Sequence, residues 1–142
     1  MRRVAPTALL LLLMTTPLAA AKDRFLIIMH EATPGTQVTR ATVSAIFLKQ
    51  APAWSDGTPT LPVDQSTRNP VRQSFAAAVL GQPIVAVQIY WQRRMSTGIT
   101  PPPVRNSDDE VMQFVAANPG AIGYVSETAT LPSGVKVIKL LD

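Results

Sequence analysis

The polar segment 64–69, together with Arg72, carries the side chains best suited to binding a ligand. The segment leads from a short apolar run into a predicted helix. The first amides of a helix lack intrahelical acceptors and lie at the positive end of its dipole, so they attract anions. Ser66 and Thr67 add hydroxyl donors, and the guanidinium of Arg68 or Arg72 can make a forked contact with an oxyanion. The pattern therefore predicts an anion site or, alternatively, a simple helix cap with Arg72 in solvent.

Three other groups of residues have a structural interpretation beside the chemical one. Arg93 and Arg94 end a predicted helix, where cations are expected simply because they oppose the dipole. The acids of segment 108–110 form a capping box with Ser107 and suit a helix start better than a metal. His30 follows a predicted strand, where ligands enter open α/β sheets. No partner nucleophile accompanies it, so we predict no catalytic residues and a protein that is not an enzyme.

The composition narrows the range of functions. The 142 residues include no cysteine and one histidine, which excludes thiol chemistry, disulfides, iron–sulfur clusters and sites that need two imidazoles. The formal net charge is +4, to which Arg2 and Arg3 contribute. Without a cluster of lysine and arginine, the chain is a poor candidate for binding nucleic acid. We expect no cofactor and no metal.

The first residues have the pattern of a secretory signal peptide. Arg2 and Arg3 precede an unbroken apolar run over 9–14, and three alanines at 19–21 offer a cleavage site. The apolar run is short for a membrane span, which needs about 20 residues. We therefore predict a signal peptide at 1–21, a single domain at 22–142, no membrane anchor after cleavage, and a periplasmic location.

The remaining chain alternates strand and helix patterns, which indicates an α/β fold with a mixed sheet. The run 24–29 is apolar throughout and predicts a strand buried on both faces, as in a parallel sheet. Proline and glycine mark most element ends, including the turn 54–57 and the stop at 118–120. Strands are predicted at 24–29, 60–64, 121–125 and 135–141, and helices at 39–49, 70–80, 83–94 and 107–117.

Three segments, in the same order, resemble the phosphate-type substrate-binding proteins of ABC importers. The segment 39–59 resembles a helix that runs to an Ile-Phe pair and is followed by a Trp-Asp turn. The segment LPVDQSTRNPVRQSF at 61–75 resembles the strand, Ser-Gly-Thr loop and ligand-facing helix start of that family. The segment FVAANPGAIGYV at 114–125 resembles its hinge-proximal strand. The match covers most of residues 25–140.

This resemblance implies a type 2 periplasmic-binding-protein-like fold, with a small mixed sheet flanked by helices in a compact or truncated lobe. It places Ser66 on the family's loop serine, with Thr67, Arg68 and Asn69 at the helix start. Arg72 is a further candidate. Thr33 is a remnant of the family's hydroxyl-rich ligand loop, which follows the first strand. The family's loop glycine is absent here, because Thr67 follows Ser66.

The expected function is reversible binding of phosphate or a similar small inorganic oxyanion. The partner implied by the resemblance is the permease of an ABC importer. The missing glycine favours an alternative, in which the protein kept the fold, lost the ligand and binds or senses an envelope protein.

Overall fold

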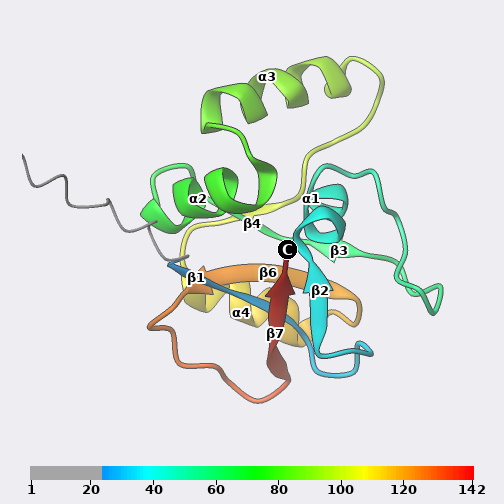
Figure 1. Ribbon diagram of the computed structural model, residues 1–142, viewed down its shortest axis with the longest axis vertical. Coiled ribbons are helices and arrows are strands. Elements are labelled where there is room, and N and C mark those ends of the chain that lie inside the picture. The colour runs from blue at the N-terminus through cyan, green and yellow to red at the C-terminus, as the bar shows by residue number, and fades with distance from the viewer. Residues whose placement is uncertain (1–23) are drawn as a thin grey trace, which may run out of the picture.

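The computed structural model describes residues 24–142 as one α/β unit (Figure 1). The predicted signal peptide lies outside the described residues. Seven strands are present in the described part: β1 Phe25–His30, β2 Gln37–Thr39, β3 Leu61–Pro62, β4 Asp64–Gln65, β5 Val104–Arg105, β6 Ala121–Ser126 and β7 Val135–Leu141. The helices are α1 Arg40–Phe47, α2 Pro70–Phe75, the π-helix η1 Ala76–Leu80, α3 Ile84–Met95 and α4 Asp108–Ala117.

Five strands form a mixed sheet in the order β2-β7-β1-β6-β3. β1 pairs antiparallel with both β6 and β7, whereas β2 and β3 run parallel to their neighbours β7 and β6. The mixed sheet confirms the predicted fold class. The expectation that β1 belongs to a parallel sheet is wrong, because burial on both faces depends on the layers above and below a strand and not on its direction.

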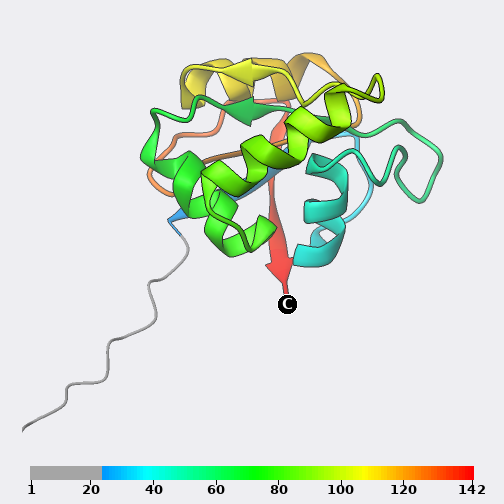
Figure 2. The same cartoon turned by 90° about the horizontal axis from the view of Figure 1, so that it is seen from above.

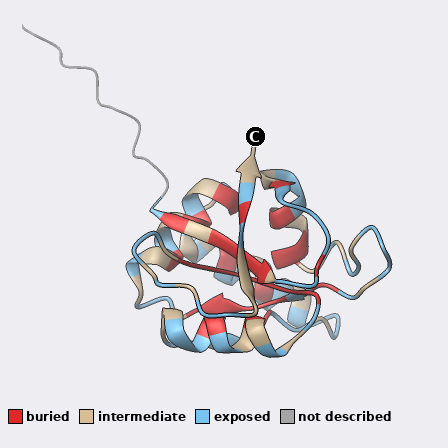
Figure 3. Cartoon of the chain, turned by 90° about the horizontal axis from the view of Figure 1, so that it is seen from below, coloured by how far each residue is buried: buried red, intermediate tan, exposed pale blue. Residues whose placement is uncertain are grey.

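Two apolar layers cover the two faces of this sheet. Along β1 the odd residues, Phe25, Ile27 and Met29, join a core with α1, α2, η1 and α3, while Ile28 joins a second core with α4. This alternation is the period of two that a strand imposes on its side chains. Figure 3 shows the buried residues gathered on the central strands and the inward sides of the helices.

The helix ends follow the local sequence closely. Thr39 caps α1 by accepting a hydrogen bond from the amide of Thr42, and Ser107 caps α4 by accepting one from Glu110. The Glu110 side chain bonds back to the amide of Asn106 at 2.8 Å, so the predicted capping box is present in a slightly longer form. These caps fix where α1 and α4 begin.

The predicted helix at 70–80 begins at Pro70 as expected but changes type after six residues. α2 gives way to the π-helix η1, which ends at Gly81 with a positive φ of 64°. α3 then turns away and lies at the end of the molecule furthest from α4 (Figure 1), and Figure 2 shows it from above. Within residues 24–142 no single helix is long and apolar enough to cross a membrane. The two helical segments Pro70–Leu80 and Ile84–Met95, which are bent by 74° relative to each other, together reach the length and apolar composition of a membrane span, and only these two properties support such an assignment.

Candidate functional site

The site predicted at 64–69 lies between the small parallel pair β4–β5 and the start of α2. Asn69 takes the extended conformation of a helix N-cap, but its side chain makes no capping hydrogen bond. Its amide nitrogen instead donates to Gln65 Oε1 at 2.9 Å and to the carbonyl of Asn106 at 3.0 Å. The predicted cap is therefore right in position and wrong in hydrogen bonding.

Because the Asn69 side chain does not cap α2, backbone amides at the start of this helix remain free to donate. The amide of Arg72 donates to the carbonyl of Asn69, and that of Arg68 donates to Ser66 Oγ at 3.3 Å. Within residues 24–142, the amides of Thr67 and Val71 have no hydrogen-bond acceptor. Unpaired amides at a helix start are the groups that an anion can accept from.

Arg72 is buried and paired with a carboxylate, contrary to the interpretation that left its side chain in solvent. Its Nε lies 3.1 Å from Asp64 Oδ1, and the two side chains are 5% and 11% exposed. Asp64 Oδ1 also accepts from the amide of Gln65 at 2.9 Å and from the hydroxyl of Tyr124. An ion pair this deep is held by several hydrogen bonds, because desolvation otherwise outweighs the attraction.

The burial of Asp64 raises the pKa of its carboxyl above the ordinary value. The Arg72 guanidinium and the Tyr124 hydroxyl act in the opposite direction, because both favour the ionised form. Burial also raises the pKa of Tyr124, so its hydroxyl stays protonated and acts as a donor to Asp64. The charge on Asp64 thus depends on a balance between burial, which favours the protonated carboxyl, and the contacts with Arg72 and Tyr124, which favour the carboxylate.

The guanidinium of Arg72 has donors left over after this pairing. Its Nε and Nη1 are buried and have no partner of hydrogen-bond geometry in the described part of the chain. A buried donor without an acceptor costs about 1–3 kcal/mol. Arg72 also lines a pocket of about 260 Å³ together with Asp64, Gln65, Ser66, Thr67, Trp91, Pro101, Pro102 and Val104. A buried cation, two hydroxyl side chains and the free amide of Thr67 around one pocket are chemically suited to an anion.

The structure brings together three of the predicted ligand residues and separates the others. Ser66, Thr67 and Arg72 line the pocket, whereas Arg68 is exposed and Asn69 is engaged in side-chain hydrogen bonds. Thr33 lies at the far end of the sheet, because it follows the end of β1. Segment 64–69 instead adjoins the end of β6 that pairs with the beginning of β1.

Thr33 itself is 4% exposed, and its backbone carbonyl accepts from Lys136 Nζ. Its hydroxyl is buried and has no partner among residues 24–142. Thr33 is therefore not part of the pocket at Arg72.

Sequence reasoning missed the polar network that connects Gln65, at the pocket, to α4 and β6. Gln65 Nε2 donates to Asp108 Oδ1 at 2.8 Å and to the carbonyl of Tyr124 at 2.9 Å. Asp108 also accepts from the amide of Ser126 at 3.2 Å and from its hydroxyl. Asp108 was predicted to serve only the helix dipole. No spacing in the sequence links it to Gln65, because the two residues meet only when α4 packs beside β4.

The other candidates keep their structural interpretations. Within residues 24–142, no group of three His, Asp or Glu side chains could hold a metal ion. His30 Nδ1 accepts from the amide of Ala32 at 3.0 Å, which is a local turn contact. The Arg94 guanidinium lies 5.8 Å from the centre of the Tyr90 ring, a cation–π arrangement at the end of α3.

The fold is that of the phosphate-type substrate-binding proteins of ABC transporters, as the sequence resemblance implied. The chain superposes on an ABC-type phosphate transport receptor from Vibrio cholerae with a TM-score of 0.65 and 21% identity. It is equally similar to a putative phosphate ABC transporter substrate-binding protein with bound phosphate from Clostridium perfringens, with a TM-score of 0.65 and 18% identity. The superposition on PstS from Borrelia burgdorferi has a TM-score of 0.64 and 14% identity. No family model and no curated protein matches the chain.

The superposition covers 83% of this chain but only 46%, 45% and 47% of those three structures. The chain therefore spans about half the length of the solved structures that it matches, which fits a truncated lobe.

Proposed function

We propose that this protein reversibly binds phosphate or a similar oxyanion in the pocket at Arg72. The observation that carries the proposal is the buried guanidinium with a donor, Nη1, that no group in residues 24–142 accepts. An oxyanion would supply that acceptor and would also accept from the free amide of Thr67, which lines the same pocket. The hydroxyls of Ser66 and Thr67 complete a donor set that matches the oxygens of a tetrahedral ion.

Phosphate is the first candidate ligand because similar structures are described as phosphate receptors, one of them with bound phosphate. A role in uptake, with export to the periplasm and delivery to an ABC importer, is part of the same proposal. It is supported by the signal-peptide pattern at 1–21 and by the fold. The protein has no need of a covalent step, since the site offers donors and no activated nucleophile.

One observation favours the second candidate function, an envelope protein-interaction module. α3 presents Val85 and Ile89 to solvent, with exposed fractions of 60% and 45%. These residues lie one turn apart on the outer side of the helix. In this second candidate function, the protein binds a partner protein through the exposed side of α3 and binds no small ligand.

The two functions are separated by calorimetry of the purified protein with phosphate, sulfate and molybdate. We expect heat of binding and a thermal shift with at least one of these ions. A Ser66→Ala, Thr67→Ala double variant is expected to bind about tenfold more weakly, because two hydroxyl donors are lost. No heat and no thermal shift at millimolar ion would contradict the anion site and leave the interaction module as the better proposal.

The raised pKa of Asp64 predicts how binding depends on pH. Above that pKa the carboxylate neutralises Arg72 and repels an anion; below it, the protonated carboxyl leaves the guanidinium charge to the ligand. Sulfate, whose charge is constant over this range, is therefore expected to bind more tightly as the pH falls. Asp64→Asn is expected to remove this dependence and to bind sulfate about tenfold more tightly at pH 8.

The control for this variant is Asp109→Asn, which makes the same change of charge at an exposed position on α4. It should leave the pH dependence of sulfate binding as it is in the unaltered protein. An equal effect of both variants would mean that only net charge matters and that Asp64 is not the group involved.

A further inference from the structure

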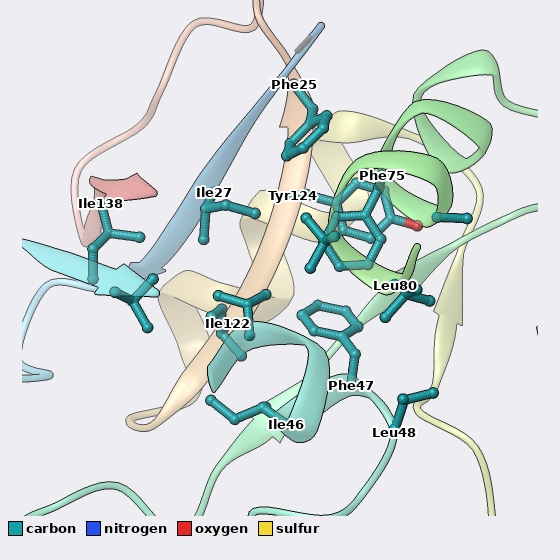
Figure 4. Close-up of a cluster of buried hydrophobic side chains, with 14 of the residues drawn as sticks. Phe25, Ile27, Ile46, Phe47, Leu48, Phe75, Leu80, Ile122, Tyr124 and Ile138 are labelled. Carbon is teal, nitrogen blue, oxygen red and sulfur yellow. The ribbon is translucent and has the colours of Figure 1, made fainter. Parts of the chain in front are cut away.

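Tyr124 is a core residue whose hydroxyl contacts two residues that line the pocket, Asp64 and Gln65. Its side chain is fully buried, and its ring stacks on that of Phe75 with centroids 3.9 Å apart and planes 5° from parallel. Phe47 and Phe25 lie at 5.8 Å and 6.5 Å on other sides of the ring. Figure 4 shows Tyr124 and Phe75 face to face within this cluster. The ring therefore has little freedom to move.

The strand that carries Tyr124 is fixed as well. β6 lies between β1 and β3 in the sheet. Gly123, the residue before Tyr124, lets α4 pack closely, since a Cβ there would come within 2.8 Å of Val111 Cγ1 and 2.9 Å of Val63 Cγ1. Close packing on one face and ring stacking on the other determine where the Tyr124 hydroxyl lies.

The hydroxyl contacts the carboxylate that pairs with Arg72. It donates to Asp64 Oδ1, the same oxygen that lies 3.1 Å from Arg72 Nε, and it accepts from the amide of Gln65 at 3.2 Å. The three side chains come from β6, β4 and α2. A contact between Tyr124 and Arg72 through Asp64 thus links the aromatic core to the candidate anion site.

We propose that Tyr124 is a positioning residue of this site: its hydroxyl holds the Asp64 carboxylate against Arg72 and so sets how much of the guanidinium charge is left for a ligand. The inference rests on the proposed anion-binding function, but its first step, the control of Asp64 by Tyr124, does not need a ligand to be tested. Tyr124 does not itself line the pocket, and the contact with Asp64 is the one by which it acts on Arg72.

Other charged groups near Asp64 are engaged elsewhere. Arg105, on the neighbouring strand β5, donates to the carbonyl of Val104 at 3.1 Å and lies over the Phe114 ring at 5.2 Å. Asp108, on α4, is connected only through Gln65. Among residues 24–142, Arg72 and Tyr124 are therefore the side chains that contact the Asp64 carboxylate directly, and together with the Gln65 amide they oppose the effect of burial on its pKa.

The test is Tyr124→Phe, which keeps the ring and removes the hydroxyl. Without this donor the ionised carboxylate is less stable, so Asp64 should take up its proton at a pH about one unit higher. Carboxyl-carbon NMR of Asp64, without any anion present, measures this directly. An unchanged Asp64 titration would overturn the proposal whether or not the protein binds an ion.

Sulfate binding gives the second readout. In Tyr124→Phe the midpoint of the pH dependence should rise with that of Asp64, so sulfate should bind about threefold more tightly at about one pH unit above the midpoint of the unaltered protein. A residue with a packing role alone would weaken binding or leave it unchanged. Weaker binding without a shift of the midpoint would therefore also overturn the proposal.

The matched control is Phe47→Leu, which disturbs the same aromatic cluster but makes no hydrogen bond to the site. It should lower the melting temperature while the Asp64 titration stays within a few tenths of a unit. If the unaltered protein binds no sulfate but Asp64 still shifts in Tyr124→Phe, the proposed function fails and the positioning of Asp64 stands.

Discussion

Replacing Arg72 with leucine is expected to abolish anion binding and to destabilise the fold. A charged hydrogen bond contributes about 1.5–3 kcal/mol, so loss of a forked contact should weaken sulfate binding more than about 100-fold. The same change leaves Asp64 buried without its cation, which typically costs about 3–5 kcal/mol. Calorimetry with sulfate and urea unfolding measure the two effects separately.

The stability loss in Arg72→Leu should grow as the pH rises. Without the guanidinium, the pKa of Asp64 is raised further, so the folded protein is favoured while the carboxyl is protonated. That contribution is lost as the pH rises through the folded-state pKa, because a buried unpaired carboxylate must then form. Unfolding at about pH 5 and pH 8 should show the larger loss at the higher pH.

The double variant Asp64→Asn, Arg72→Leu is the control for this prediction. It removes both charges, and replacing both members of a buried pair is often close to neutral. We expect most of the stability to return while sulfate binding stays absent. Sulfate affinity within about threefold of the unaltered protein in either variant would show that the anion site is not at Arg72.

Gly120→Ala is expected to have the largest effect on stability among the glycines that take a positive φ. Gly120 has a φ of +87°, and a Cβ there would lie 2.3 Å from the carbonyl oxygen of Pro59. The Gly120 carbonyl also accepts from the Trp54 indole at 2.9 Å and from the amide of Leu61 at 3.1 Å. A shift of the backbone would disturb both hydrogen bonds, which join segment 54–61 to the start of β6.

We expect this variant to lose about 3–4 kcal/mol, from the left-handed conformation and the steric clash together. Gly57→Ala is a matched control, since Gly57 has the same φ of +87° but no atom within 4 Å of the added Cβ. It should lose only about 1–2 kcal/mol. Urea unfolding of both variants measures the difference, and equal losses would mean that the contact with Pro59 contributes nothing.

Several elements could be predicted from local sequence because local physics decides them. β7 occupies the residues predicted for it, and α2 begins at Pro70 as expected. The turn before Thr58 forms through the Asp56 side chain, which accepts from the amide of Thr58 at 2.9 Å. Caps, prolines and glycines act within a few residues, so their effect can be deduced without knowledge of the fold.

The strands β2 and β5 could not be predicted in this way. β2 falls between the strand predicted at 24–29 and the start of the helix predicted at 39–49, and it becomes a strand because it pairs with residues 139–141 of β7. β5 follows three prolines and pairs with β4 over two residues. Both depend on a partner distant in sequence, and neither has an apolar pattern of its own.

The positions of most helices and strands, the resemblance to a family of binding proteins and the polar loop before α2 could all be deduced from the amino-acid sequence, because these depend on residue types at short range. The burial of Arg72, its pairing with Asp64 and the hydrogen bond from Tyr124 to Asp64 depend instead on the tertiary structure. Tyr124 and Asp64 are 60 residues apart in the chain. Their contact follows from the place of β6 in the sheet and the packing of α2 over it, which no local pattern specifies.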